Sequence, residues 1–129
     1  MNFEIQTTSY FDAEAKRLAK RYRSFIDDLQ DFRQSLLGNP YQGAELSPGI
    51  RKIRLTIDSK SRGKSGGARV ITFTYLVDET DGKIILILLY DKADASNIKM
   101  NVVRKILKDI GLDLETLQKE GKLKTPKLT

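Results

Sequence analysis

The sequence contains no cysteine and no histidine. Without cysteine, the chain can form no disulfide, no thiolate metal site and no cysteine nucleophile. Without histidine, it can build neither a Ser-His-Asp triad nor a histidine zinc site, and it lacks the side chain that most readily transfers protons near neutral pH. Any acid–base chemistry must therefore come from lysine, arginine, tyrosine, aspartate or glutamate, and we expect no metal or other cofactor.

The sequence also lacks any long apolar run. None approaches the roughly 18 consecutive apolar residues typical of a transmembrane helix, so we expect no membrane partner. The first ten residues, MNFEIQTTSY, include an acid and lack the apolar stretch of a signal peptide. A chain of 129 residues fits one domain, and the absence of cysteine is compatible with a reducing compartment. We therefore expect a cytoplasmic protein.

The positive charge of the chain is concentrated in one short stretch. The formal net charge is +6. Residues 50–69 carry seven cations and one acid, which also gives +6, so the rest of the chain sums to zero. A positive field confined in this way is typical of a surface that binds a polyanion such as RNA, although a solvated face is the simpler alternative. The seven cations are Arg51, Lys52, Arg54, Lys60, Arg62, Lys64 and Arg69.

Apolar periodicity predicts an α+β fold. Alternation indicates strands, apolar residues three or four positions apart indicate helices, and Gly38 and Gly111 mark two helix ends. The expected elements are a strand over residues 3–7, helices over 9–22 and 24–38, strands over 51–57, 69–77 and 83–90, and a helix over 96–110. They predict an antiparallel-rich sheet of about four strands with an N-terminal helical hairpin and a C-terminal helix. Residues 112–129 are lysine-rich and are expected to form a partly disordered tail.

The strand expected over residues 51–57 separates two kinds of side chain. Because successive side chains of a strand point to opposite faces, Lys52 and Arg54 share a polar face, while the apolar residues between them face a core. Arg51 lies in register with the apolar residues, so we expect it at an edge or in a salt bridge and exclude it from catalysis. The strand thus presents cations on the side away from the core that it covers.

The connection over residues 58–68, DSKSRGKSGGA, is the most unusual segment. It spans 11 residues between strands expected to be neighbours, and it holds three glycines, three serines and three cations. Hairpin loops usually take about two to five residues, so a function explains this connection better than packing does. Glycines let backbone N–H groups approach a phosphate closely, beside lysines that can reach it. A P-loop is excluded, because Asp58 occupies the position of its first glycine and a strand follows instead of a helix.

The stretches IRKIRLTIDSKSRGKSGGARVITF (residues 50–73) and LLYDKADASNI (residues 88–98) resemble the RelE/HigB-like branch of the RelE/ParE superfamily of type II toxin–antitoxin toxins. The resemblance implies a β-α-α-β-β-β-α toxin domain over residues 1–111, followed by the tail over residues 112–129. It also implies a ribosome-dependent endoribonuclease that cuts mRNA in the ribosomal A site and is inhibited by a cognate antitoxin protein.

The resemblance further implies which residues form the site. Arginines and lysines would stabilise the charge that develops on the phosphate when the RNA 2′-hydroxyl attacks it. Lys52 or Lys64 would transfer a proton, and Tyr90 would be an alternative base or a platform for base stacking, because neighbouring cations ease the ionisation of a tyrosine. The catalytic candidates are Lys52, Arg54, Lys64, Arg69 and Tyr90, and the RNA-binding candidates are Lys60, Arg62 and Lys92.

Two positions depart from the family pattern. RelE-type toxins carry an arginine and a tyrosine where this sequence has Ala93 and Lys99. Two alternatives to the enzyme therefore stay open, namely a non-catalytic RNA-binding or ribosome-binding member of the family and a ParE-like inhibitor of gyrase. Asp91 and Asp94, which follow the last strand, are assigned to a turn and a cap.

Overall fold

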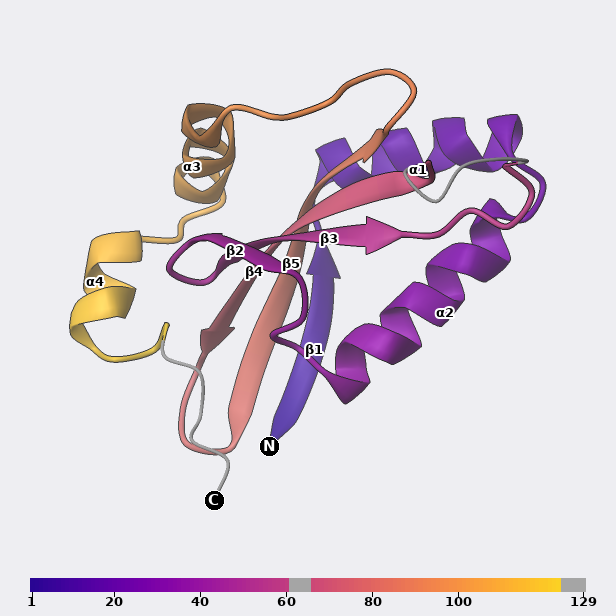
Figure 1. Ribbon diagram of the computed structural model, residues 1–129. Coiled ribbons are helices and arrows are strands. Elements are labelled where there is room, and N and C mark those ends of the chain that lie inside the picture. The colour runs from indigo at the N-terminus through magenta and orange to yellow at the C-terminus, as the bar shows by residue number, and fades with distance from the viewer. Residues whose placement is uncertain (61–65, 124–129) are drawn as a thin grey trace.

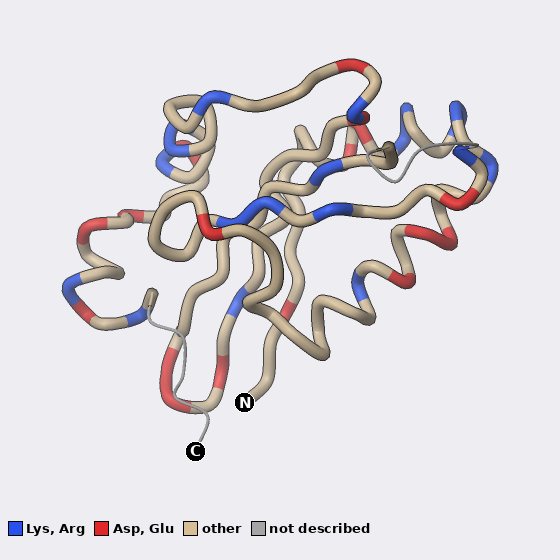
Figure 2. Tube along the Cα trace, viewed as in Figure 1, with Lys and Arg blue, Asp and Glu red and all other residues tan. Residues whose placement is uncertain are grey.

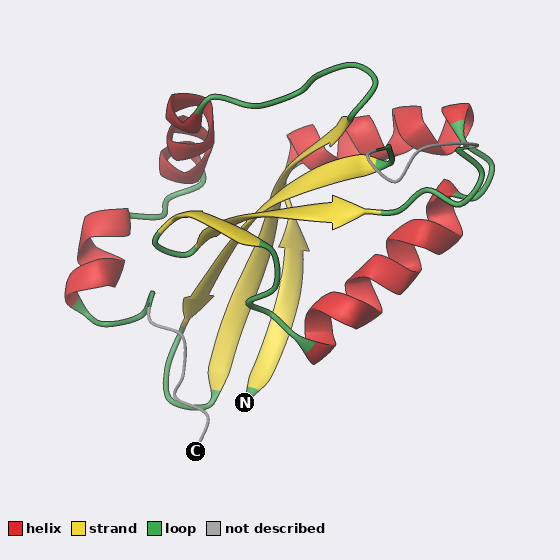
Figure 3. Ribbon diagram, in the orientation of Figure 1, coloured by secondary structure: helices red, strands yellow, loops and turns green. Residues whose placement is uncertain are grey.

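The computed structural model describes residues 1–60 and 66–123. In this part of the chain, an open five-stranded sheet lies between helices on both of its faces (Figures 1 and 3). The strands are β1 (Asn2–Thr7), β2 (Ala44–Ser47), β3 (Ile50–Leu55), β4 (Ala68–Leu76) and β5 (Asp81–Asp91). The helices are α1 (Ser9–Arg21), α2 (Phe25–Gly38), α3 (Met100–Asp109) and α4 (Leu114–Lys119). No helix in these described ranges is long and apolar enough to cross a membrane.

The sheet has the strand order β1-β5-β4-β3-β2. The β1–β5 pair is parallel, and the other three pairs are antiparallel. The α+β class, the helical hairpin and the antiparallel-rich sheet confirm the prediction, but the expected element order β-α-α-β-β-β-α and the count of about four strands are wrong. The order omits β2, which has four mostly exposed residues, and α4. Strand β2 forms through its pairing with β3, which no alternation within the segment itself indicates.

Each face of the sheet carries its own apolar core. One face is covered by α1 and α2, which bury Phe11, Leu18, Phe25 and Leu36 against it. Helix α3 covers the other face with Val103, Ile106 and Leu107. Because residues of β4 and β5 belong to both cores, the position of these two strands in the fold is fixed from both sides.

The segment after Gly111 also packs on the second face. The sequence predicts a partly disordered tail here, but residues 112–123 contain α4, and Leu76 N–H donates to Lys122 O at 2.8 Å. The physical reason is the recurrence of apolar residues along the segment, which gives it a side to bury. The leucines that pack against the second core are Leu112, Leu114, Leu117 and Leu123. The remaining residues of the predicted tail, 124–129, lie outside the described ranges.

Candidate functional site

Strand pairing brings three of the predicted site residues into one line across the sheet. Arg54 of β3 pairs with Arg69 of β4, and Arg69 pairs with Tyr90 of β5. Directly opposed residues of antiparallel strands project from the same face, which here is the face that α3 covers, because Tyr90 belongs to its core. Lys52 precedes Arg54 by two residues and therefore shares this face. We call Lys52, Arg54, Arg69 and Tyr90 the sheet-face cluster.

The cations of the sheet-face cluster lie where the sheet is open to solvent. Arg54 is exposed, and Lys52 and Arg69 are half-buried. Figure 2 shows the concentration of Lys and Arg positions along β3 and at the start of β4. Neither Lys52 nor Arg54 forms an ion pair with another described residue. Like charges placed directly opposite on neighbouring strands destabilise a sheet, so the Arg54–Arg69 pair favours an anion beside it.

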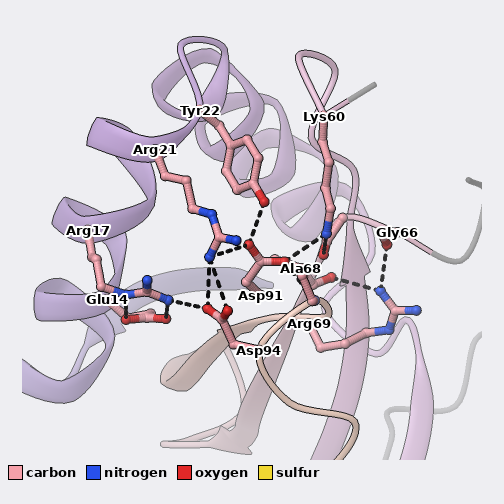
Figure 4. Close-up of polar contacts among 12 residues, drawn as sticks. Glu14, Arg17, Arg21, Tyr22, Lys60, Gly66, Ala68, Arg69, Asp91 and Asp94 are labelled. Atoms are coloured by element: carbon pink, nitrogen blue, oxygen red, sulfur yellow. Dashed lines mark hydrogen bonds and ion pairs between the residues drawn. The ribbon is translucent and has the colours of Figure 1, made fainter. Parts of the chain in front are cut away.

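The backbone and the side chain of Arg69 are both held in place. Its backbone is part of the pairing with β3 and β5. Its guanidinium Nη1 donates to Gly66 O and to Ala68 O, each at 3.1 Å. Figure 4 shows the side chain extending toward Gly66 and away from Asp91. A donor fixed in this way can stabilise a developing negative charge without first having to reorganise.

Arg54 also lies near acidic side chains of α2 and of the segment after β3. It borders a groove of which Asp28 and Asp31 of α2, and Asp58, line other parts. The acidic positions of α2 are visible in Figure 2. Acidic side chains therefore lie close to Arg54 on the side of the groove.

Tyr90 is the one member of the sheet-face cluster that is not accessible. The residue is 5% exposed, and its hydroxyl is buried with no hydrogen-bond partner among the described residues. Burial raises the pKa of Tyr90 above 10, and nearby Arg69 only partly opposes this rise. The neighbouring cation Arg69 acts in the predicted direction, but the burial of the ring has the larger effect on the pKa of Tyr90. In this conformation Tyr90 is neither a ready base nor a stacking platform.

Lys60 lies on the other face of the sheet. Its Nζ forms an ion pair with Asp91 Oδ1 at 2.7 Å, and it donates to Gly67 O at 3.2 Å (Figure 4). Asp91 directly follows Tyr90, so its side chain projects from the opposite face. The structure thus separates Lys60 from the sheet-face cluster, although the sequence groups it with the RNA-binding cations.

Asp91 is a buried acid whose importance the sequence does not reveal. Its side chain is fully buried and accepts from Tyr22 Oη at 2.6 Å and from Ala93 N at 2.9 Å, in addition to Lys60. Arg21 Nη1 lies 3.3 Å from its carboxylate. Burial opposes ionisation, but the hydrogen bonds from Lys60, Tyr22 and Ala93 outweigh it and lower the pKa of Asp91 below its usual value. An acid directly after an apolar strand is the only signal that could have marked it.

The other predicted residues have separate places. Lys92 Nζ donates to Ser96 O at 3.4 Å within the connection that follows β5. Arg62 and Lys64 lie outside the described ranges. Arg51 pairs with Glu45 Oε2 at 2.9 Å, which confirms the salt bridge expected for it.

In comparisons with known proteins, no family model and no curated protein matches this chain.

Replacing Asp91 with asparagine is expected to lower the free energy of unfolding near neutral pH by about 3 kcal/mol, because it removes the charge of a buried pair. Since folding lowers the pKa of Asp91, this contribution is complete above the unfolded value of about 3.9 and is lost as the pH falls through the folded value. Urea denaturation at a series of pH values measures the difference between wild type and variant.

That difference should be constant from neutral to mildly acidic pH and should shrink once the pH falls below about 4. Asp109→Asn, on the exposed surface of α3, is the control and should leave stability unchanged. A wild-type advantage that persists undiminished in strong acid would show that the charge of Asp91 contributes nothing.

Proposed function

We propose that this protein is a type II toxin of the RelE/HigB-like kind, with the RelE-like arrangement of its toxin domain, that cleaves mRNA in the ribosomal A site. The observation that carries the proposal is the direct opposition of Arg54 and Arg69 on an open sheet face. Two guanidinium groups on adjacent strands can bind one phosphate from two sides, and arginine is well suited to phosphate recognition.

The chemistry follows from what RNA itself supplies. The 2′-hydroxyl is the nucleophile, and the phosphate gains negative charge as the oxygen attacks. Arg54 and Arg69 stabilise that charge, and Lys52 on the same face transfers a proton. Lys64 is a second proposed proton-transfer group, from the connection that precedes Arg69. The ribosome contributes by holding the message in line for the attack.

The proposal implies two partners. The first is mRNA on the ribosome, whose phosphates the cations of the sheet-face cluster contact. The second is a cognate antitoxin protein, which silences the toxin by covering its cations. A segment rich in acids is suited to that task, because complementary charge speeds association and favours the correct partner.

The ends of the RNA fragments test the proposed mechanism. In a reconstituted translation system, the purified protein should produce fragments with a 5′-hydroxyl and a 2′,3′-cyclic or 3′-phosphate, because the 2′-hydroxyl is the attacking group. Labelling with polynucleotide kinase before and after phosphatase treatment distinguishes the two kinds of 5′ end. Fragments with a 5′-phosphate would indicate attack by activated water and would contradict the mechanism.

A second candidate is a non-catalytic module that binds RNA or the ribosome. The observation that favours it is the burial of the Tyr90 hydroxyl, which removes one proposed base from reach of RNA. Ala93, at a position where RelE-type toxins carry an arginine, adds no cation. This candidate predicts binding through the same sheet face without cleavage.

The salt dependence of ribosome binding tests the RNA contact that both candidates share. If Lys52 and Arg54 each contact a phosphate, changing both to glutamine should flatten the slope of log K against log salt by about 1.4. The control is the double change Lys16→Gln and Lys20→Gln on α1, which removes the same charge from exposed positions. Equal flattening by both pairs would mean that net charge, and not the sheet-face cluster, determines binding.

A further inference from the structure

The last residue of β5, Asp91, is a fully buried acid next to the proposed site. Asp91 follows Tyr90 and lies beneath the end of α1. An apolar residue of similar size in place of a buried ion pair is often as stable or more stable, so stability alone does not account for such a charge. Buried charges are better attested as devices that specify one arrangement of neighbouring segments.

The contacts of Asp91 come from segments far apart in the sequence. Tyr22 follows α1, and Lys60 is the third residue of the glycine-rich connection between β3 and β4. Figure 4 shows both side chains converging on the Asp91 carboxylate, with Arg21 beside them. Ala93 N–H donates to the same carboxylate from the turn itself. The carboxylate therefore joins α1, the connection and the end of β5.

Lys60 connects the Asp91 carboxylate with the far end of the glycine-rich connection. Its Nζ donates to Gly67 O at 3.2 Å, and Lys92 N–H donates to the same oxygen at 3.1 Å. Lys60 belongs to the part of the connection that follows β3, and Gly67 to the part that precedes β4. Asp91 thus holds the first part directly through Lys60, and it holds the second part through the contact of Lys60 with Gly67. The start of the connection is held further by Ser59, whose N–H donates to Ser24 Oγ at 2.8 Å.

Gly67 lies directly beside the groups that orient Arg69. The Arg69 guanidinium donates to Gly66 O and Ala68 O, the carbonyls on either side of Gly67. A shift of Gly67 therefore moves both acceptors, and the guanidinium with them. The contacts form one chain from the Asp91 carboxylate through Lys60 and Gly67 to Arg69, which reaches from one face of the sheet to the other.

We propose that Asp91 is a positioning residue, which clamps Lys60 and Gly67 so that Arg69 is held where a phosphate binds on the opposite face. The effect on catalysis rests on the proposed function, whereas the clamp itself does not. The clamp also assigns Lys60 a role within the protein in place of an RNA contact. In this role Asp91 acts on Arg69 through Lys60 and Gly67, and not through a contact with the RNA.

Hydrogen exchange tests the clamp without any assay of activity. The Lys92 amide, which donates to Gly67 O, should exchange about tenfold faster or more in Asp91→Asn and in Lys60→Met. Amides in the β1–β5 pair should keep their rates, and the Arg69 Nε–H resonance should shift in both variants. Combining the two substitutions should add little, because each breaks the same link. Faster exchange throughout the sheet, or unchanged exchange at Lys92, would overturn the clamp.

Single-turnover kinetics on programmed ribosomes test the positioning role. Asp91→Asn should lower the rate at saturating protein about tenfold or more, while ribosome affinity stays within about twofold. Tyr22→Phe, which removes one hydrogen bond and keeps the ion pair, should have a smaller effect. Faster exchange at Lys92 with an unchanged rate would overturn the positioning role. If the wild type cleaves no message, the proposed enzymatic function is wrong. In that case the hydrogen exchange at Lys92 and the shift of the Arg69 resonance alone test whether Asp91 clamps Lys60 and Gly67.

Discussion

Replacing Arg69 with alanine is expected to slow cleavage of ribosome-bound message about 100-fold, which corresponds to roughly 3 kcal/mol of transition-state stabilisation. The side chain is held by Gly66 O and Ala68 O and opposes Arg54 across the strand pair. A donor held in this way contributes most when charge develops on the phosphate. Ribosome affinity should fall much less, because only one of several phosphate contacts is lost.

Single-turnover rates and equilibrium binding, measured on the same programmed ribosomes, separate the two effects. Arg104→Ala is the matched control, because it removes an exposed cation from α3 and should change neither the rate nor the fold. Both variants must melt as the wild type does, since Arg69 is part of a central strand. A proportional loss of rate and affinity would make Arg69 a docking residue and would contradict its catalytic role.

Replacing Gly67 with alanine is expected to lower the free energy of unfolding by about 3 kcal/mol. Gly67 has φ +76°, a conformation that costs other residues about 1–2 kcal/mol, and a Cβ there would lie 2.6 Å from Leu55 O. Because that neighbour is backbone within β3, relief of the contact must move a strand, which adds a further cost of about 1–3 kcal/mol.

Gly111 provides a control with the same backbone conformation and no crowding. It has φ +88°, and a Cβ there would have no atom within 4 Å. Gly111→Ala should therefore cost only about 1–2 kcal/mol, for the backbone conformation alone. Urea denaturation of the two variants gives the comparison. Equal losses at both positions would show that the approach of Gly67 to β3 does not constrain the connection.

The strands and helices that could be predicted from the sequence are those in which apolar residues recur at the spacing of a strand or a helix. Alternation of Lys52, Arg54 and the apolar residues between them predicts β3 and assigns its two faces correctly. Strand β2 could not be predicted, because its four residues are mostly exposed and its structure comes from pairing with β3. Likewise, α4 is too short to have a clear helical period.

For the candidate site, too, features encoded within one segment could be predicted, whereas contacts between distant segments could not. Residue type and local alternation are enough to select Arg54 and Arg69 as cations of the sheet, but only the register of pairing shows that they oppose each other. Lys60 is assigned to RNA by its charge, whereas its contact with Asp91 is made across 31 residues of sequence. A pattern within a segment does not encode a long-range ion pair. For the same reason, the burial of Tyr90 could not be deduced from its place at the end of a strand.

The most direct test of the central claim is the fate of a message bound in the A site when every ribosome carries the protein. Ribosomes programmed with a defined codon would be saturated with wild-type protein, and primer extension would measure the fraction of message cut in a single turnover. Occupancy would be verified by sedimentation of the same sample. The account predicts that most of the message is cut at the A-site codon, and that Arg69→Ala leaves it largely intact over the same interval. Full occupancy with an uncut message in the wild-type sample would contradict the account and would leave a module that only binds.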